Sequence, residues 1–439
     1  FLLSSNRKEW VEFDIAIMLA GGISVPSFVT NNLNDNEFIF KDSKPKIVIL
    51  EDETIYEKNY FFLKNFNQNR IICINNSNNF NSYKFIISEK GKKNYLPKLL
   101  REDISTIIYT SGTSGNPKGV VLNYKSLLHN LKASLDILSD FKITRERFLS
   151  FLPLSHSYER MAGLYFPLLI GGEIYFCTSL EKLLIEIKEV KPTIFSAVPR
   201  LYENIYKKIR GQMKSSNKLK SFVIKLIFEG IDNDRDYLKF LFVKILIFLF
   251  LKNQIGNVFG GKVKALISGG AALSPKIGYF FNKVGLKLLQ GYGQTEAAPL
   301  ISCNVRNKND PGSVGFPVTN VEVKIAEDDE ILVKGDNVMA GYWKNSKLTQ
   351  ETLIDGWLHT GDLGYFDKIG RLFINGRKKD LLVTSGGDNI SVQRIETKLT
   401  ENIEINQAVI FGDNKPYLVA LVVVKEDISY QQVKDIINN

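Results

Sequence analysis

The part of the sequence best suited to chemistry is a run of hydroxyl and glycine residues, YTSGTSGNPKGV, at positions 109–120. We expect it to lie between a strand ending at Tyr109 and a helix, where backbone N–H groups and a helix start can receive phosphate oxygens. The glycines allow close approach, and Lys118 supplies a mobile positive charge. The candidate phosphate-binding residues of this loop are Thr110, Ser111, Gly112, Thr113, Ser114, Gly115 and Lys118.

Two common nucleotide-binding patterns do not fit this sequence. The Walker A pattern fails because Pro117 precedes Lys118 and Gly119 follows it. The later run GYGQTE at 291–296 is not a dinucleotide-binding fingerprint, because Glu296 stands where the third glycine belongs. An ordinary Ser/Gly-rich surface loop remains the alternative at 109–120, and the density of hydroxyl groups argues against it.

Other short runs also hold residues that could contact a ligand. The run SGGAAL at 268–273 ends an expected strand with two glycines, where a flat ring can lie against bare backbone. His156 lies in LPLSHSYER, and Asp362 closes WLHTGD. Taken alone, such a histidine is more often structural, and such an aspartate more often belongs to a turn. The runs GRKKD at 376–380 and TSGGDNI at 384–390 follow.

Elements that could position these residues alternate between strand and helix in the first part of the chain. Short β-branched runs at 46–50, 70–75, 193–197 and 263–268 read as strands of a parallel sheet. Leucines at helical spacing between residues 128 and 138 follow Asn123, a candidate N-cap. From Gly312 onward, short strands separated by turns predict a β-rich subdomain. We therefore expect an α/β fold with a domain boundary near Arg377–Asp380.

Length and composition are those of a globular protein of two or three packed units, with 439 residues, 44% hydrophobic and 24% charged. The net charge of +10 and pI near 9.1 favour an anionic partner such as a nucleotide, coenzyme A, nucleic acid or acidic lipid. The three scattered cysteines, Cys73, Cys177 and Cys303, have no metal-ligand spacing and indicate a reducing compartment. Nothing in the sequence gives the oligomeric state.

One basic and apolar stretch, at 202–251, has two interpretations. The plainer one is a solvated helix face, and the other is peripheral contact with the inner face of a membrane by a cytoplasmic protein. The apolar run at 237–251 contains Lys239 and Lys244 and is shorter than the roughly 20 residues that a membrane-spanning helix needs. We therefore expect a buried or interfacial helix there.

Taken in order, these motifs resemble those of the adenylate-forming superfamily, and the His156 run is similar to that of long-chain acyl-CoA synthetases. The resemblance covers nearly the whole chain, from Asn6 to about Val424. It implies an N-terminal AMP-binding domain at 1–376, made of αβ layers (1–311) and a β-rich subdomain (312–376). A small mobile α+β domain would occupy 377–439. Both ends look truncated, and the family's C-terminal catalytic lysine would lie beyond Asn439.

The resemblance also implies a role for each motif. His156 would lie beside the carboxylate being activated, Glu296 would hold Mg²⁺, and Lys379 would be the pivot of the C-terminal domain. Lys118 and Arg377 would stabilise charge during catalysis. The nucleotide would contact the loop residues above and also Gly269, Gly270, Ala271, Gly291, Tyr292, Gly293, Thr295, Asp362 and Arg377. Tyr292 would stack on adenine, Thr295 would meet the α-phosphate, and Asp362 would hold the ribose hydroxyls. Coenzyme A would contact Ser385, Gly386 and Gly387, although Asp388 and Val392 depart from residues common in relatives.

The implied reaction is activation of a long-chain fatty acid by ATP and Mg²⁺, followed by thioester formation with coenzyme A. Three alternatives stay open at this point: adenylation of a medium-chain, aryl or amino acid, a nucleotide-binding protein without catalysis, and nucleic-acid binding. The last depends on charge alone and is discounted, so no nucleic-acid partner is expected. The basic and apolar stretch at 202–251 and the form of the His156 motif favour fatty acids as substrates.

Overall fold

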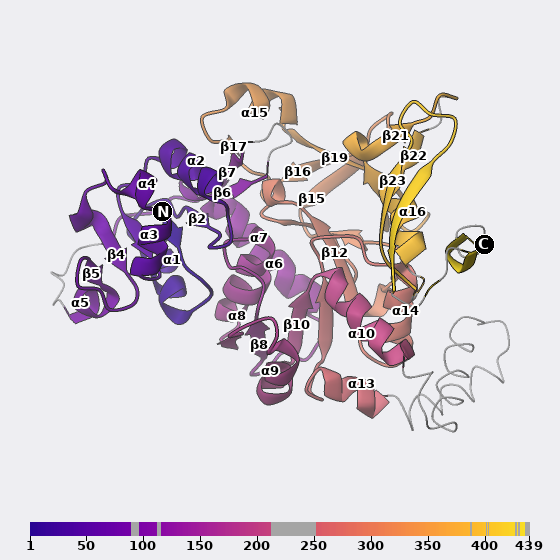
Figure 1. Cartoon of the computed structure of the whole chain (residues 1–439), viewed down its shortest axis with the longest axis horizontal. Helices are drawn as coiled ribbons and strands as arrows, with labels where there is room; N and C mark the ends of the chain where they lie inside the picture. The colour runs from indigo at the N-terminus through magenta and orange to yellow at the C-terminus, as the bar shows by residue number, and fades with distance from the viewer. Residues whose placement is uncertain are drawn as a thin grey trace.

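The computed structural model describes residues 1–88, 96–111, 116–211, 252–386, 389–400, 402, 404–425, 428 and 431–434. The predicted residues Gly112, Thr113, Ser114, Gly115, Gly387 and Asp388, and most of the 202–251 stretch, therefore lie outside the described part of the chain. Figure 1 shows the chain passing from an N-terminal αβ unit through a central sheet to a small C-terminal unit.

The N-terminal unit is built on a five-stranded parallel sheet in the order β2-β1-β3-β4-β5. Its buried face contains Leu3, Val48 and Ile71, all at most 1% exposed. The strands are β1 (Leu2–Leu3), β2 (Pro26–Ser27), β3 (Val48–Leu50), β4 (Ile71–Cys73) and β5 (Asn81–Ser82). The helices are α1 (Lys8–Leu19), α2 (Leu33–Ser43), α3 (Glu53–Lys58), α4 (Tyr60–Leu63) and α5 (Tyr83–Ser88), with the short η1 (Gln68–Arg70).

A β-hairpin and two short strands connect this unit to the centre of the molecule. β6 (Ile104–Thr110) pairs antiparallel with β7 (Lys118–Asn123), which also pairs with β17 (Gly341–Tyr342). β8 (Arg147–Ser150) pairs parallel with β9 (Glu173–Phe176). The helical segments here are α6 (Tyr124–Leu138), α7 (Ser157–Glu159), the π-helical turn η2 (Arg160–Tyr165) and α8 (Phe166–Leu169).

The central sheet has the order β10-β11-β12-β13-β14, and its first three strands are parallel. Their carboxyl ends lie at one edge, which is where open α/β sheets bind ligands. The strands are β10 (Ile194–Ala197), β11 (Ala265–Ser268), β12 (Leu288–Gly293), β13 (Leu300–Cys303) and β14 (Phe316–Pro317). The accompanying helices are α9 (Leu183–Val190), α10 (Pro199–Gly211), α13 (Lys252–Val258), α14 (Pro275–Lys283), η5 (Thr295–Ala297) and η6 (Arg306–Lys308).

The remaining chain is β-rich and then ends in a small α+β unit. The β-rich part comprises β15 (Val321–Ile325), β16 (Glu330–Gly335), β18 (Leu353–Ile354), β19 (Trp357–Phe366) and β20 (Leu372–Arg377), with α15 (Ser346–Thr352). After η7 (Lys378–Asp380) come β21 (Leu381–Val383), β22 (Asn389–Ser391), α16 (Val392–Thr400), β23 (Ile405–Phe411) and β24 (Val419–Val424). Figure 1 places these last elements beside β12 and α14, away from the N-terminal unit.

Two local expectations are wrong. The 109–120 loop joins two antiparallel strands and not a strand and a helix, because residues 118–123 themselves pair with 104–110 as β7. Asp362 lies within β19, paired with Arg377, and not in a loop. By contrast, α6 begins at Tyr124, and the side chain of its N-cap Asn123 accepts a hydrogen bond from Ser126 N–H at 3.0 Å, as predicted.

The leucine spacing of α6 identifies the helix but not its buried face. Leu128 and Leu135 are exposed, whereas Leu127, Asn130 and Ala133 are buried. Within the described residues, no helix combines the length and apolar character needed to cross a bilayer.

Candidate active site

A single cavity of about 1030 Å³ lies at the carboxyl edge of the central sheet and extends between the hairpin β6–β7 and strands β16 and β19. Its lining includes residues from all of the main predicted motifs: 110–111, 116–119, 156–158, 268–270, 291–296, 359–361 and 377–379. Motifs separated by more than two hundred residues therefore meet around one space. This is a volume at the upper end of the range for small-molecule sites.

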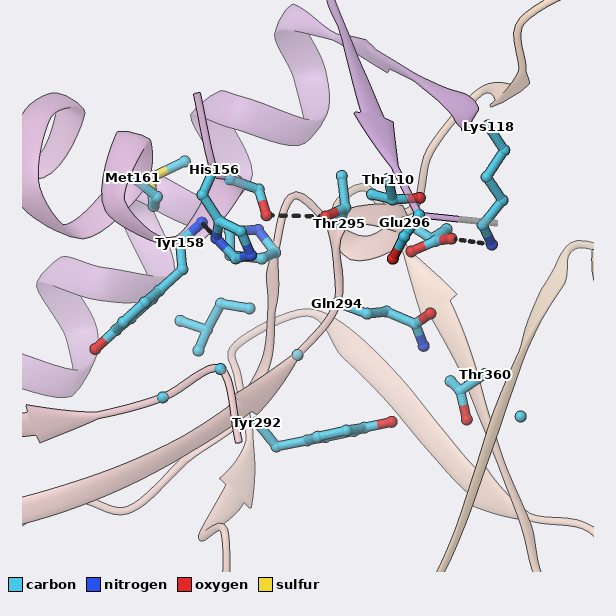
Figure 2. Close-up of a pocket in the computed structure, with 18 of the residues that line it drawn as sticks. Thr110, Lys118, His156, Tyr158, Met161, Tyr292, Gln294, Thr295, Glu296 and Thr360 are labelled. Atoms are coloured by element: carbon cyan, nitrogen blue, oxygen red, sulfur yellow. Dashed lines mark hydrogen bonds and ion pairs between the residues drawn. The ribbon is translucent and has the colours of Figure 1, made fainter. Parts of the chain in front are cut away.

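One end of the cavity contains a lysine, a carboxylate and a phenol in direct contact. Lys118 Nζ donates to Glu296 Oε1 and to Tyr342 Oη, both at 2.7 Å, and Tyr342 Oη donates to Glu296 Oε1 at 2.8 Å. Figure 2 shows Lys118 and Glu296 facing each other across this end. Burial, and then the charge of Glu296, raise the pKa of Tyr342, so the phenol keeps its proton. Thr110 lies at the same end, and its buried hydroxyl has no hydrogen-bond partner among the residues that the structure describes.

Asp362 and Tyr292 form a second polar group. Tyr292 Oη donates to Asp362 Oδ2 at 2.7 Å, and Arg377 Nε donates to Oδ1 of the same carboxylate at 2.7 Å. The Asp362 side chain is 7% exposed, so its charge is balanced mainly by Arg377. Burial, followed by the charge of Asp362, raises the pKa of Tyr292 well above its usual range. A carboxylate held between these donors can accept the hydroxyls of a sugar if the donors move aside.

Glu330 is a site residue that the sequence did not single out. Its carboxylate accepts from Gly361 N–H at 2.8 Å and from Lys378 Nζ at 3.1 Å, and it contacts His359 Nδ1 at 3.1 Å. It thereby ties the strand that carries Asp362 to the residue after Arg377. Only the glutamate at the start of a short strand, EILV, could have suggested it, and that is a weak signal.

Bare backbone lines the cavity at two glycine positions. Gly270 has φ +81°, which side chains rarely adopt, and the ring of Tyr158 packs against Gly269, where a Cβ would lie 3.0 Å from it. At Gly293 a Cβ would lie 1.9 Å from the Pro299 carbonyl oxygen. Gly269 and Gly270 line the cavity, whereas the exposed Ala271 does not.

The other end of the cavity is apolar. Met161 and Tyr158 lie on the side of His156 away from Lys118 (Figure 2). The hydrophobic residues at this end come from α6, η2, α8 and strands β10, β11 and β13. They are Ile137, Leu138, Met161, Ala162, Phe166, Ile194, Ile267, Leu300 and Cys303. We call this part the apolar branch.

His156 lies where the polar and apolar parts meet. Its Nδ1 accepts from Tyr158 N–H at 3.2 Å, which caps α7 and fixes the ring. Burial lowers the pKa of His156, so the imidazole is neutral at neutral pH. Nearby, Ser157 Oγ lies 3.1 Å from Thr295 Oγ1, which links the His156 motif to the Glu296 motif.

A magnesium ion fits this site through one protein ligand. Among the described residues there is no group of three or more His, Cys, Asp or Glu side chains that could hold a metal by themselves. Mg²⁺ commonly takes one or two carboxylates together with substrate phosphates and water, so Glu296 beside a bound triphosphate is a suitable donor. Lys118 and Tyr342 both bond to its Oε1 and not to its Oε2.

The coenzyme A prediction has less geometric support. Ser385 and Gly386 are exposed and do not line the cavity, whereas Lys379 does. Besides Glu330, the structure adds Tyr342, Asp42 and Lys344 to the lining. Tyr342 and Lys344 follow the β-rich run in a segment, GYWKN, that carried no recognised motif.

The predicted motifs thus surround one cavity in the α/β and β-rich parts of the chain, and its lining ends at Lys379, where the small C-terminal unit begins. The family described as "AMP-binding enzyme" matches residues 1–343, and "AMP-binding enzyme C-terminal domain" matches 379–439. The chain therefore belongs to the AMP-binding enzyme family.

Several named proteins are similar to this chain. A long-chain-fatty-acid–CoA ligase of Mycobacterium bovis is 31% identical over 441 residues, covering 96% of this chain and 72% of that protein. Long chain acyl-CoA synthetase 3 of Arabidopsis thaliana is 30% identical, with 96% and 68% covered.

Solved structures share the fold at lower identity. An anthranilate CoA ligase in complex with anthranoyl-AMP superposes with a TM-score of 0.76 at 21% identity, covering 99% of this chain and 79% of that one. An o-succinylbenzoate coenzyme A synthetase from Bacillus subtilis, in complex with ATP and magnesium ion, gives 0.73 at 22% identity, with 99% and 81% covered. These likenesses establish an adenylate-forming fold.

Proposed function

We propose that this protein is a long-chain-fatty-acid–CoA ligase that forms an acyl-AMP from a fatty acid and ATP, and then an acyl-CoA. One observation carries the proposal: a single cavity joins a polar end at Lys118, Glu296 and Arg377 to the apolar branch at Leu138, Phe166 and Ile194. A molecule with a nucleotide at one end and an alkyl chain at the other matches that division. The curated relatives named above point to the same substrates.

In the first step a carboxylate oxygen attacks the α-phosphorus of ATP. The new O–P bond replaces the bond to the β-phosphate, and pyrophosphate leaves. Because only anions meet here, positive charge and aligned dipoles must supply most of the stabilisation. Lys118 and Arg377 provide the charge, Thr295 and Thr110 provide hydroxyl donors, and Mg²⁺ held by Glu296 would neutralise phosphate charge.

In the second step the thiol sulfur of coenzyme A attacks the acyl carbon. The carbon–oxygen bond to AMP breaks, AMP leaves as the anion, and the thiol proton passes to solvent. We propose that Lys379 is the pivot about which residues after it turn, bringing Ser385–Gly387 to the cavity. The position of Ser385 and Gly386 at the surface agrees with an arrangement that precedes this turn.

Within the site we propose that adenine lies between the ring of Tyr292 and the backbone of Gly269–Gly270, and that Asp362 binds the ribose. His156 would lie beside the acyl carboxylate as a neutral hydrogen-bonding group. The position of His156 between the polar end and the apolar branch supports its role, and the contact of Tyr292 with Asp362 supports a shared nucleoside site.

The experiment is an acid series. Pyrophosphate release is measured with palmitate, octanoate, benzoate and amino acids at fixed ATP and Mg²⁺, and acyl-CoA is then measured after coenzyme A is added. We expect palmitate to give the highest kcat/KM and acyl-CoA to accumulate only with coenzyme A. Equal or better turnover of benzoate or an amino acid would contradict the proposal.

We also propose that the protein works at a membrane surface, where long-chain fatty acids are found. The described part of the basic stretch does not supply that contact, because Tyr202, Ile205 and Ile209 of α10 are buried against the core. The proposal therefore depends on residues 212–251, which lie outside the described chain. Co-flotation with vesicles containing phosphatidylglycerol, but not with phosphatidylcholine alone, is the expected result. Failure to float with either would contradict it.

A further inference from the structure

One short segment forms part of both ends of the cavity. Residues 294–300 present Thr295 and Glu296 toward the polar end, as Figure 2 shows, and Pro299 and Leu300 also line the cavity. Leu300 packs with the buried cluster that includes Leu138, Phe166 and Ile194 around the apolar branch. A ligand that contacts Leu300 therefore contacts the same segment that carries Glu296.

Asn130 holds this segment from the helix α6. Its Nδ2 donates to the Ala297 carbonyl oxygen at 3.1 Å, and its Oδ1 accepts from Leu300 N–H at 2.8 Å. The second Nδ2 hydrogen is directed to the Ser126 carbonyl oxygen at 3.3 Å. Asn130 is fully buried, so each of these bonds would be costly to lose without replacement. The side chain thus fixes both sides of the turn that follows Glu296.

The same helix is a wall of the apolar branch. Ser134, Ile137 and Leu138, in the next two turns after Asn130, line the cavity. Ser134 Oγ donates to the Asn130 carbonyl oxygen at 2.9 Å, so a cavity-lining residue and Asn130 lie on the same turn of the helix. A chain that fills the branch contacts α6 at Leu138 and the clamped segment at Leu300. Asn130 is the direct hydrogen-bonded link between these two walls.

We infer that Asn130 is a positioning residue that couples occupancy of the apolar branch to the placement of Thr295 and Glu296 at the nucleotide. The inference rests on the proposed function, because it takes the branch to hold an acyl chain and the polar end to hold ATP. An acyl chain that orders α6 and Leu300 lowers the cost of ordering the 294–300 segment around the triphosphate. By linkage, each substrate raises the affinity of the other by the same factor.

Asn304 offers a matched control. It is fully buried like Asn130, and its Nδ2 donates to the Ser313 carbonyl oxygen at 2.7 Å while its Oδ1 accepts from Asp310 N–H at 3.0 Å. It lies after β13 and does not line the cavity. Replacing either asparagine with alanine removes the same kind of buried bonds to backbone. Of these two asparagines, Asn130 is the one that bonds α6 to the 294–300 segment.

The test is the affinity for the ATP analogue with an α,β-methylene bridge, titrated with and without palmitate. The carboxylate cannot displace the methylene-bridged group from the α-phosphorus of this analogue, so no acyl-AMP forms and the coupling is measured without turnover. We expect palmitate to tighten analogue binding about fivefold or more in the unaltered protein and in Asn304→Ala. In Asn130→Ala we expect palmitate to change the affinity for the analogue by less than about twofold. Leu300→Ala keeps the hydrogen bond from the Leu300 N–H to Asn130 but removes the side chain that an acyl chain would contact. We expect this variant also to lose most of the coupling.

Three results would overturn the inference. They are a coupling factor near one in the unaltered protein, an unchanged factor in Asn130→Ala, and an equal loss of coupling in Asn304→Ala. The proposed function is judged separately by palmitate-dependent pyrophosphate release in the unaltered protein. If that release occurs while palmitate leaves analogue binding unchanged, the inference fails and the function stands. If no fatty acid releases pyrophosphate, the proposed function fails.

Discussion

At the scale of the residue, Lys118 contributes a charge that the protein already holds in place. Its contacts with Glu296 and Tyr342 keep the ammonium group at the polar end, and its side chain is 30% exposed. A triphosphate can then take over one of these contacts without a large movement of the lysine. Such a fixed donor stabilises charge at little cost of reorganisation.

We predict that Lys118→Ala slows acyl-AMP formation about ten- to thousand-fold, because a single electrostatic donor to the phosphates is lost. Rapid-quench measurement of pyrophosphate release checks this. Lys8→Ala, which removes an exposed ion pair with Glu12 on α1, serves as the control and should leave the rate unchanged. An unaltered rate in Lys118→Ala would count against the assigned role.

Glu159 is a buried carboxyl group next to the His156 motif. It is 1% exposed, and among the described residues its carboxyl oxygens make no well-formed hydrogen bond, so Ser150 and the Phe151 backbone only partly offset its burial. Its side chain packs against Gly163, where a Cβ would lie 2.2 Å from Oε1. Burial raises the pKa of this carboxyl to about 8, so the folded protein holds it neutral at pH 7.

This shift has a direct consequence for stability. Because the folded pKa is raised above the unfolded value of 4.5, the folded state binds the proton more tightly, and stability falls as pH rises from 4.5 to about 8. Between pH 5 and pH 7.5 the loss is roughly 3 kcal/mol. We predict that Glu159→Gln removes this part of the pH dependence. The free energy of unfolding, measured with urea at the two pH values, checks this prediction. If it changes equally with pH in both proteins, the pKa of Glu159 is not raised in the folded state.

At the scale of the element, the π-helical turn η2 shapes the apolar branch. Such turns are rare and frequently occur at functional sites. Here it places Met161 and Ala162 on the cavity wall, while Arg160 is buried with Asp14 and donates to Thr106 Oγ1 at 2.8 Å. The buried Arg160–Asp14 ion pair therefore supports the wall, and the small residue Ala162 faces the cavity.

We predict that Ala162→Phe shortens the preferred acyl chain. Ala162 is only partly buried and lines the cavity, so a larger side chain can extend into the branch. The kcat/KM for palmitate should fall at least about tenfold relative to octanoate, as one filled pocket changes discrimination by 1–3 kcal/mol. An acid series run on both proteins measures this ratio. A parallel fall for every chain length would indicate general damage to the fold.

The elements themselves could be predicted where apolar runs and capping residues were clear. Strands β10 and β11 and the helix α6 with its Asn123 cap were expected from residue pattern alone. The β6–β7 hairpin was not predicted because Lys118 and Gly119, at the start of β7, were assigned to the phosphate-binding loop and not to a strand. The buried face of α6 was missed because Asn130 is polar, and its bonds to Ala297 and Leu300 are visible only in three dimensions.

At the scale of the whole molecule, three layers bring distant segments to one cavity. The central sheet supplies strand ends, the β6–β7 hairpin supplies Lys118, and the β-rich part supplies Glu330 and Arg377. The order of motifs could be predicted from the sequence through resemblance. Contacts such as Glu330 with Lys378 could not, because they join residues 48 positions apart that carry no recognised pattern.

The small C-terminal unit contacts the rest of the protein sparingly in the described residues. Lys207 Nζ of α10 lies 3.5 Å from the Ile405 carbonyl oxygen, and Gly376 lies close to Ser391. The C-terminal family match begins at residue 379, directly after Lys378 is held by Asp328 and Glu330. A turn about Lys379 would therefore start from a fixed base and break few contacts.

The most direct test is a crystal structure with palmitoyl-AMP bound. We predict adenine beside Tyr292 and Gly269–Gly270, ribose at Asp362, phosphate near Thr295 and Lys118, and the alkyl chain between Leu138, Phe166 and Ile194. A ligand bound outside this cavity, or an alkyl chain directed away from the apolar branch into solvent, would contradict it.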